Sequence, residues 1–257
     1  MRKLSRMPKH RPAHRKVRRP SVGAVILGII GELCITVALV LGLYVLWELY
    51  WSSWEVEENR EIAIAEFHAQ LPPPVKEEGV KRTDAPPPFE AVGWGETIGV
   101  LHMTQWGMQI PVVEGTDMSL LDQALAGHYP TTDQAGDVGN FAIAAHRRTR
   151  GNNFRRIDVL EPGDRFVLET KDAWLVYEMR SREIVDPGAI DVLWPVPHEK
   201  DATPSQRLMT MTTCHPEFGS SERFIVYSEL VYWMPRDSGT PEELKAESVV
   251  SESDTQG

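Results

Sequence analysis

Cys214 is the only cysteine after Cys34, and the residues around it predict a reactive site. It ends the segment RLMTMTTC (207–214), which is rich in strand-forming residues and runs into the loop HPEFGSSE. A thiol at the end of a strand is more exposed than one in its middle, and its thiolate is a nucleophile. The other interpretation is an inert cysteine that packs as a small apolar residue.

Two further residues at predicted strand ends could assist such a nucleophile. His146 ends the alternating segment GNFAIAAH (139–146), and Arg223 opens RFIVYSELVYW (223–233), nine residues after Cys214. Taken alone, a histidine such as His146 is more often structural or on the surface, and an arginine such as Arg223 is more often a salt-bridge partner. Together, an acid or base, a nucleophile and a cation that donates to an oxyanion are the parts of covalent acyl transfer. His146 lies 68 residues before Cys214, so only the fold can bring the two together.

Two other histidines are candidates for parts of this site. His215 follows Cys214 directly, but adjacent strand residues point to opposite faces, so we favour His146 as the partner of the thiol. His128, in AGHYP, is a candidate for the substrate groove or for support of the site. The eight histidines are scattered, and only the adjacent pair Cys214-His215 is close enough in sequence to suggest a metal, so we expect neither a metal nor a cofactor.

The strands that must position these residues lie in one folded segment, 89–235. Besides the three segments already named, RFVLET (165–170) and AWLVYEMRS (173–181) predict a hairpin after the turn signal EPGD. Regular strands separated by Gly and Pro turns favour an all-β fold, a closed barrel or a sandwich, with short helices. MSLLDQALAGHYP (118–130) is expected to be helical and to stop at Gly127.

The chain before this domain predicts a membrane anchor. Residues 1–20 carry nine Lys and Arg and no acidic residue, and residues 22–47 form an apolar run whose only charge is Glu32. This run is longer than the ~20 residues that a helix needs to cross a bilayer core. Basic residues stay on the cytoplasmic side, so we expect 1–21 inside the cell, one transmembrane helix over 22–47, and the rest outside. A buried core helix is the alternative, and nine cations at one end disfavour it.

The segments on either side of the domain have their own character. Residues 48–88 predict a juxtamembrane amphipathic helix over 55–71 and then an extended Pro-rich linker over 72–88. The acidic, Ser-rich segment 236–257 is expected to be a disordered tail.

The charge distribution limits the partners of the chain. Residues 48–257 carry 18 Lys and Arg against 36 Asp and Glu, which argues against nucleic acid as a partner. The basic N-terminal segment has anionic membrane lipid as its natural neighbour. Cys34 lies inside the predicted anchor, so Cys214 has no partner in its own compartment. An unpaired cysteine in an exported domain indicates an intermolecular bridge or a reactive thiol.

Three motifs in this domain resemble those of the sortases, membrane-anchored cysteine transpeptidases of Gram-positive bacteria. The sequence TMTTC (210–214) followed by Arg223 resembles the signature T-L-x-T-C followed by Arg, with Met in place of Leu, a change that conserves volume. GDVGNFAIAAHR (136–147) resembles the block P-G-x-x-G-N-x-x-I-A-G-H-R, with Ala145 at the position of the last Gly. EPGDRF (161–166) resembles a further G-D turn, and the context is most similar to class E sortases of high-GC bacteria.

The resemblance, which covers 89–235, implies a fold and an activity. The fold would be the closed eight-stranded sortase barrel. Cys214 would attack the Thr–Gly bond of a sorting signal such as L-P-x-T-G or L-A-x-T-G in a secreted protein and form a thioacyl-enzyme. An amine of a peptidoglycan precursor or a pilin lysine would then take the acyl group.

The resemblance also implies roles for individual residues. His146 would act as general acid and base, and Arg223 would hold the substrate or the oxyanion. Thr213, Thr212 and His128 would contribute to substrate binding, and the loop 186–204 would line the groove.

Other functions stay open from the residues alone. An exported cysteine protease would use the same chemistry with water as the acceptor. A noncatalytic single-pass protein of wall assembly would contain an inert cysteine. An L,D-transpeptidase also uses Cys and His, but its S-x-G-C-[IV]-R block is absent from this sequence.

Overall fold

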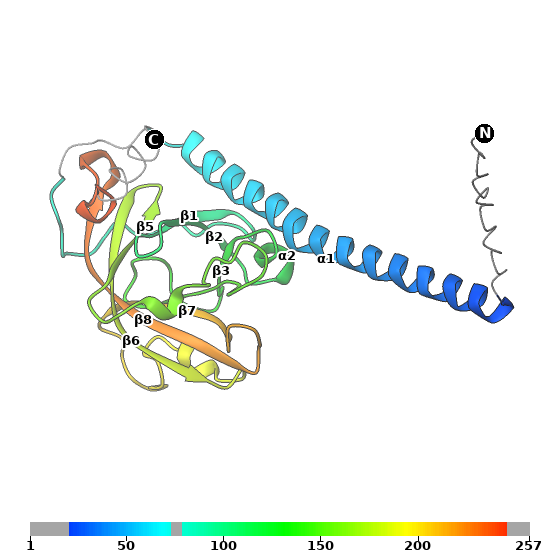
Figure 1. Cartoon of the computed structure of the whole chain (residues 1–257). Helices are drawn as coiled ribbons and strands as arrows, with labels where there is room; N and C mark the ends of the chain where they lie inside the picture. The colour runs from blue at the N-terminus through cyan, green and yellow to red at the C-terminus, as the bar shows by residue number, and fades with distance from the viewer. Residues whose placement is uncertain (1–20, 73–78, 246–257) are drawn as a thin grey trace, which may run out of the picture. The chain divides into compact units, whose positions relative to one another are not determined.

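The computed structural model describes residues 21–72 and 79–245 of the chain, which divides into two compact units, 1–49 and 50–257. One helix, α1 (Val22–Ala69), runs through the described part of the first unit and into the second (Figure 1). Its stretch Val25–Val45 is long and apolar enough to cross a membrane. The prediction of one such helix over 22–47 agrees with this finding.

The predicted juxtamembrane helix is a continuation of this same helix and not a separate element. No Gly or Pro interrupts the sequence between Trp47 and Leu71, so the hydrogen-bond ladder continues to Ala69. Pro72 and the prolines after it cannot continue a helix, which explains why it ends there.

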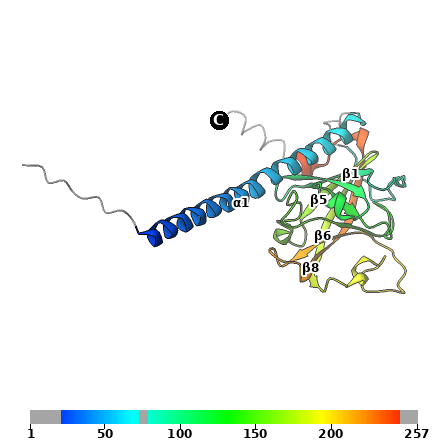
Figure 2. The ribbon, with the colours of Figure 1, turned by 90° about the vertical axis from the view of Figure 1, so that its right-hand side faces the viewer.

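The second unit is built around eight strands that close into a barrel (Figure 1, Figure 2). Around the barrel they follow the order β1-β2-β3-β4-β7-β8-β6-β5, and β5 pairs with β1 to close it. The strands are β1 (Thr97–Met103), β2 (Met108–Glu114), β3 (Ala126–His128), β4 (Gly139–Ala144), β5 (Arg165–Thr170), β6 (Ala173–Val185), β7 (Arg207–His215) and β8 (Glu222–Pro235). The closed eight-stranded barrel implied by the motifs is confirmed, and closure leaves the sheet without a free edge.

Short helices lie in the connections between strands. They are α2 (Met118–Leu121) and the 3₁₀ turns η1 (Ile157–Val159), η2 (Ile190–Leu193) and η3 (Arg236–Ser238).

The prediction of a helix over 118–130 is wrong beyond its first turn. α2 ends at Leu121, and Ala124 has a φ of +63°, a left-handed conformation that a helix cannot continue through. Gly127, expected to stop a helix, lies inside β3 instead. A Cβ there would come within 2.2 Å of the Gly115 carbonyl oxygen, so only glycine allows this close approach of backbones.

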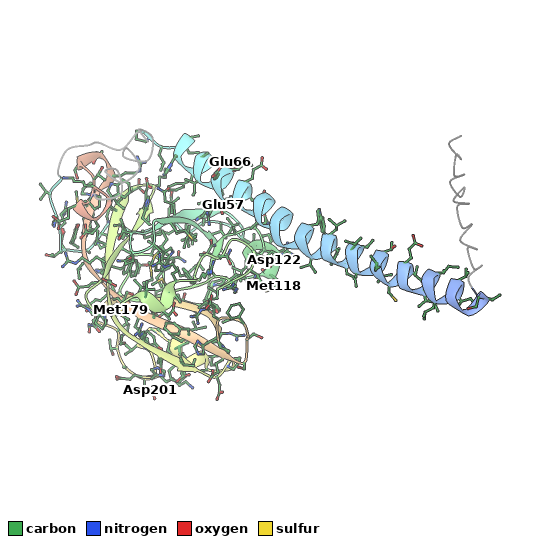
Figure 3. The ribbon with its side chains drawn as sticks, viewed as in Figure 1. Glu57, Glu66, Met118, Asp122, Met179 and Asp201 are labelled. Carbon is green, nitrogen blue, oxygen red and sulfur yellow. The ribbon has the colours of Figure 1, made fainter. Side chains whose placement is uncertain are left out.

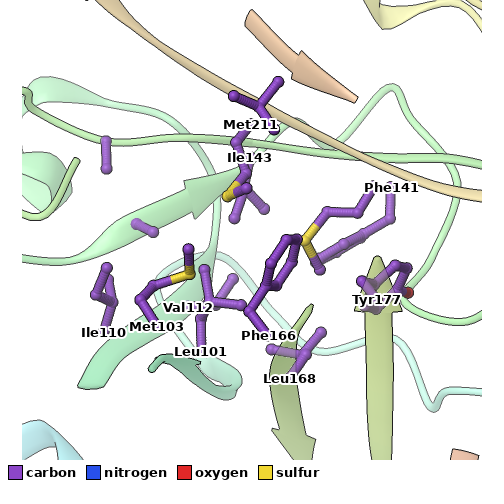
Figure 4. Packing of buried hydrophobic residues seen from close by; sticks show 14 of the residues in the cluster. Leu101, Met103, Ile110, Val112, Phe141, Ile143, Phe166, Leu168, Tyr177 and Met211 are labelled. Atoms are coloured by element: carbon purple, nitrogen blue, oxygen red, sulfur yellow. The ribbon is translucent and has the colours of Figure 1, made fainter. Parts of the chain in front are cut away.

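The barrel interior is filled by alternate residues of the strands (Figure 4). Met209 and Met211 of β7 pack there with Phe141 and Ile143 of β4, all at most 1% exposed. Burying one such side chain contributes about 1.5–3 kcal/mol. This alternation fixes which face each strand presents, so the residues between the methionines face outward, where Thr210 donates to Asn140 Oδ1 at 2.7 Å.

Both flanking segments pack on the barrel where the structure describes them. Residues 79–88 of the predicted Pro-rich linker form no helix and no named strand, yet Arg82 exchanges two backbone hydrogen bonds of 2.9 Å with Trp233 of β8. The segment 236–257 was expected to be disordered throughout. Arg236 is instead buried and forms an ion pair of 2.8 Å with Glu169, which anchors the beginning of that segment. Residues 1–20, 73–78 and 246–257 lie outside the described part of the chain.

The C-terminal part of α1, from Tyr50 to Ala69, belongs to the second unit. Val56 and Phe67 are buried, and His68 Nε2 lies 3.0 Å from Glu169 Oε2. Arg60 donates to the carbonyl oxygen of Gly151 at 3.2 Å. Gly151 lies in the loop that begins at His146, so this helix supports the same loop that carries the predicted base.

Candidate active site

The strand register brings His146 next to Cys214. β4 and β7 are parallel, and their paired residues run from Gly139 with Arg207 to Ala144 with Thr212. The same offset of 68 residues, continued past the last pair, matches His146 with Cys214. Two further hydrogen bonds extend the pairing in that direction, from Ala145 N to Thr212 O at 3.2 Å and from Thr213 Oγ1 to Ala145 O at 2.7 Å.

Arg223 lies on the other side of Cys214. β7 and β8 are antiparallel, and Cys214 and Arg223 are direct partners in their register. Side chains of directly opposite residues share a face, with Cβ atoms about 4.5–5.5 Å apart. The three predicted catalytic residues therefore form one row across the adjacent ends of β4, β7 and β8. Cys214 is partly exposed there, as a thiol that reacts must be.

His146 has a carboxylate partner that the sequence did not reveal. Its Nε2 lies 2.8 Å from Asp122 Oδ1, just after α2, near the Asp122 label in Figure 3. A carboxylate accepts, so Nε2 carries the proton of a neutral ring and Nδ1 is left to exchange a proton. The His146 side chain is 16% exposed and that of Asp122 is 41% exposed. The expected helix over 118–130 would have placed Asp122 inside a helix, so the sequence did not suggest it as a partner of His146.

The guanidinium of Arg223 is held by backbone and not by a carboxylate. It donates to the carbonyl oxygens of Ser220 at 3.0 Å and Glu222 at 2.9 Å. Among residues 21–72 and 79–245, none forms an ion pair with it. Its charge therefore stays available to a negatively charged oxygen beside Cys214.

The hydroxyl groups of Thr212 and Thr213 help to hold together the strands that carry the row of His146, Cys214 and Arg223. Both are buried, at 5% and 3% exposure. Thr213 donates to the Ala145 carbonyl, and Thr212 Oγ1 lies 3.2 Å from the Tyr129 hydroxyl and 3.3 Å from the Ile143 carbonyl oxygen. These contacts hold β4 and β7 in register. They leave little of either side chain for direct contact with a substrate.

His128 does not reach the groove in which it was expected. It is fully buried, with Nδ1 2.8 Å from Glu114 Oε2 and Nε2 3.0 Å from Thr132 Oγ1. Its ring stacks on Phe141 at a centroid distance of 4.7 Å. A ring with no exposed surface and both nitrogens occupied cannot contact a peptide in a groove. The structure gives it a supporting position between β3 and the barrel core.

The loop between β6 and β7, expected to line the groove, is fastened at two points. Asn140 of β4 donates to the carbonyl oxygens of Val192 at 3.1 Å and Trp194 at 3.0 Å. His198 lies between Asp191 at 2.7 Å and Glu183 at 2.6 Å. The hydrogen bond with Asp191, and then that with Glu183, raises the pKa of His198 above its usual value.

A metal centre is a different kind of site that the same residue types could build. Over the described ranges, no group of three or more His, Cys, Asp or Glu side chains is arranged to hold a metal ion.

Comparison with known proteins identifies the family of the chain. A family model of the sortase domain matches residues 101–231. Sortase SrtE1 of Streptomyces coelicolor is 33% identical over 248 residues, which cover 94% of this chain and 67% of that protein.

Two solved structures are similar in fold as well as in sequence. The SrtA sortase from Actinomyces oris has a TM-score of 0.61 and 49% identity, and the match covers 64% of this chain and 96% of that one. Sortase E1 from S. coelicolor, solved with a tripeptide in its active site, has a TM-score of 0.55 and 38% identity and covers 58% and 97%. The chain therefore belongs to the sortase family of cysteine transpeptidases, and the resemblance of its motifs to class E sortases is confirmed.

Proposed function

We propose that this protein is a single-pass membrane transpeptidase that joins secreted proteins to an amine of the cell wall. Its substrate is the Thr–Gly bond of a C-terminal sorting signal of the L-A-x-T-G or L-P-x-T-G kind. The single observation that carries the proposal is the row of His146, Cys214 and Arg223 at three adjacent strand ends. The tripeptide in the active site of the S. coelicolor enzyme supports a peptide as the ligand of such a site.

The first half of the reaction forms a thioester. The Cys214 thiol gives its proton to Nδ1 of His146, its sulfur attacks the threonine carbonyl carbon, and the carbonyl oxygen takes up negative charge. Arg223, with no carboxylate to neutralise it in the described structure, donates to this oxyanion. The bond to glycine then breaks, and the protonated His146 delivers its proton from Nδ1 to the departing glycine nitrogen.

The second half transfers the acyl group. An amine attacks the thioester, His146 takes a proton from it, and the Cys214 thiolate leaves. Asp122 orients the His146 ring in both halves, because its carboxylate fixes the proton on Nε2. A peptidoglycan cross-bridge amine and a pilin lysine are the two acceptor classes that this chemistry serves.

The anchor defines where the reaction occurs. The stretch Val25–Val45 spans the membrane, and the nine cations of residues 1–20 keep the N-terminus in the cytoplasm. The barrel then lies outside the cell, where secreted proteins and the wall meet.

The test is an exchange assay on the full chain in detergent. It is incubated with an L-A-x-T-G or L-P-x-T-G peptide, with and without triglycine, and analysed by mass spectrometry. An acyl adduct on Cys214 and an exchanged peptide are expected. Hydrolysed peptide alone, with no exchange even at high amine concentration, would indicate an exported protease. An unreactive Cys214, also towards a thiol reagent, would indicate a noncatalytic wall-assembly protein.

A further inference from the structure

The residues that follow the three members of the active-site row also meet one another. Arg147 follows His146, His215 follows Cys214 and Phe224 follows Arg223. Neighbouring residues of a strand point to opposite faces, so these three come together behind the row. The Arg147 guanidinium lies 2.9 Å from His215 Nδ1 and 5.4 Å from the centre of the Phe224 ring. The His215 and Phe224 rings are 5.9 Å apart between centroids.

Arg147 is a buried cation in a defined setting. It is 4% exposed, and its second terminal nitrogen lies 3.1 Å from Asp158 Oδ2, in η1. A buried guanidinium is costly unless it is paired, so this ion pair explains why the side chain is tolerated. One arm of the fork is then committed to Asp158 and the other to His215. The planar guanidinium can therefore move only if Asp158 and His215 move with it.

The contact with Arg147 determines the proton position on His215. A guanidinium only donates hydrogen bonds, so His215 Nδ1 must accept with its lone pair. The ring is then neutral and carries its proton on Nε2. Protonating Nδ1 as well would break this bond and place two cations side by side.

The other charges near His215 do not supply a competing partner. Glu222 of β8 is its cross-strand neighbour, but within residues 21–72 and 79–245 its carboxylate forms no hydrogen bond or ion pair with the His215 ring. Glu217, in the loop that follows His215, forms ion pairs with Arg148 at 2.5 Å and Arg155 at 3.6 Å. Arg147 is thus the charged group that bonds to the His215 ring in the described structure.

We infer that Arg147 is a positioning residue that holds His215 neutral and ties the His146 loop to the Cys214 strand end. Two imidazoles flank the thiol in this chain, one on each face, and only one of them can be the acid and base. Arg147 removes His215 from that role and fixes the spacing between the loop after His146 and the end of β7. The inference rests on the proposed function only for its kinetic consequence.

The direct test is the tautomer of His215, read at pH 8 by ¹⁵N NMR of the full chain in detergent with labelled histidine. The signal is assigned with His215→Gln. In the wild-type chain we expect the proton on Nε2 and an unprotonated Nδ1 that accepts from Arg147. In Arg147→Met this constraint is gone, and both tautomers should be populated. Arg148→Met, the same change at the next residue, should leave the His215 tautomer as in the wild type.

A kinetic test separates positioning from a purely structural role. Arg147→Met should lower kcat of the exchange reaction by about tenfold to a hundredfold, with KM changed little. His215→Gln offers an amide oxygen to Arg147 and should keep kcat within about threefold. His215→Leu should lose as much as Arg147→Met.

The outcomes are decisive even if Arg147→Met does not fold. A wild-type His215 that carries its proton on Nδ1, or that populates both tautomers, overturns the inference. An unchanged His215 tautomer in a folded Arg147→Met chain also overturns it. These measurements need no sorting peptide, so absent turnover with the expected tautomer would count against the proposed function and leave this inference standing.

Discussion

His146 and Cys214 are 68 residues apart, and every paired residue of β4 and β7 is separated by the same number. The bond between Arg147 and His215 continues that offset one residue further. The place of the predicted base beside the predicted nucleophile therefore follows from the register of β4 and β7, continued two residues past the end of β4. A slip of one residue would turn Cys214 to the opposite face from His146, so the proposed activity depends on this register.

Cys214→Ala should reduce adduct formation and exchange to background while the barrel still folds. The thiol is partly exposed and fills no core position, so its loss leaves little cavity. Mass spectrometry and a thermal melt check both parts, and Cys34→Ala serves as the matched control with full activity. Turnover retained in Cys214→Ala would contradict the mechanism.

Asp122→Asn should lower kcat by about tenfold or more with KM nearly unchanged. The amide can present either end to His146 Nε2, so it no longer fixes the ring tautomer. We expect less than the ~10⁴-fold loss of a buried triad aspartate, because the Asp122 side chain is 41% exposed and water can replace it. Asp117→Asn, in the same segment but bonded to Trp94, is the control that should leave kcat unchanged.

Arg223→Gln should lower kcat by about 10²–10³-fold, the usual cost of losing an oxyanion donor. Arg223→Lys should recover part of the rate, since it keeps the charge but not the planar fork. Steady-state kinetics of the exchange reaction measure both, and Arg180→Gln, an exposed arginine paired with Glu229, is the control. Equal losses in kcat for Gln, Lys and the control would exclude an oxyanion role.

Thr213→Val should destabilise the barrel and slow the reaction together. It removes the hydrogen bond to the Ala145 carbonyl, leaving that buried acceptor unpaired at a cost of about 1–3 kcal/mol. The same bond holds the residue before His146 against β7. Urea unfolding gives the first effect and kcat the second. Thr104→Val, whose contact of 3.4 Å is at the limit of a hydrogen bond, should change neither. A stable but slow Thr213→Val chain would point to a direct substrate contact instead.

Acid should weaken the barrel through Glu169, which lies where α1, β1 and the segment after β8 meet. Its burial alone would raise its pKa, but hydrogen bonds with His102 and His68 and their charges outweigh this and lower the pKa to about 2. A carboxyl with a lowered folded-state pKa stabilises the fold above its unfolded value of 4.5. That contribution, about 3 kcal/mol, is lost as the pH falls from 4.5 through 2.

The unfolding free energy of the wild type and of Glu169→Gln, measured from pH 6 to pH 2, checks this prediction. The two curves should converge towards low pH, because the wild-type carboxyl becomes neutral like the amide. Parallel curves across the whole range would contradict it. Glu161→Gln, an exposed acidic residue in the turn before β5, is the control whose curve should follow that of the wild type.

Part of the fold could be predicted because its signals are local. β4 to β8 are alternating, β-branched or aromatic segments between Gly and Pro turns, and the predicted spans agree with the structure within a few residues. β1, β2 and β3 were not predicted. β3 has only three residues and β2 contains Pro111, so neither has an alternating apolar and polar pattern long enough to predict a strand. Their pairing is decided by partners elsewhere in the barrel.

Sequence alone determined which residues could do chemistry and where an anchor could lie. Residue type makes Cys214 a candidate nucleophile, His146 a candidate base and Arg223 a cation, and the apolar run 22–47, whose only charge is Glu32, is long enough to cross a membrane; none of this depends on a distant neighbour. Only the tertiary structure decided which histidine shares a row with Cys214, which carboxylate bonds to it and which residue bonds to His215. Asp122 with His146, and Arg147 with His215, are contacts between segments separated by 24 and 68 residues. Such contacts depend on barrel closure and strand register, which no short stretch of sequence encodes.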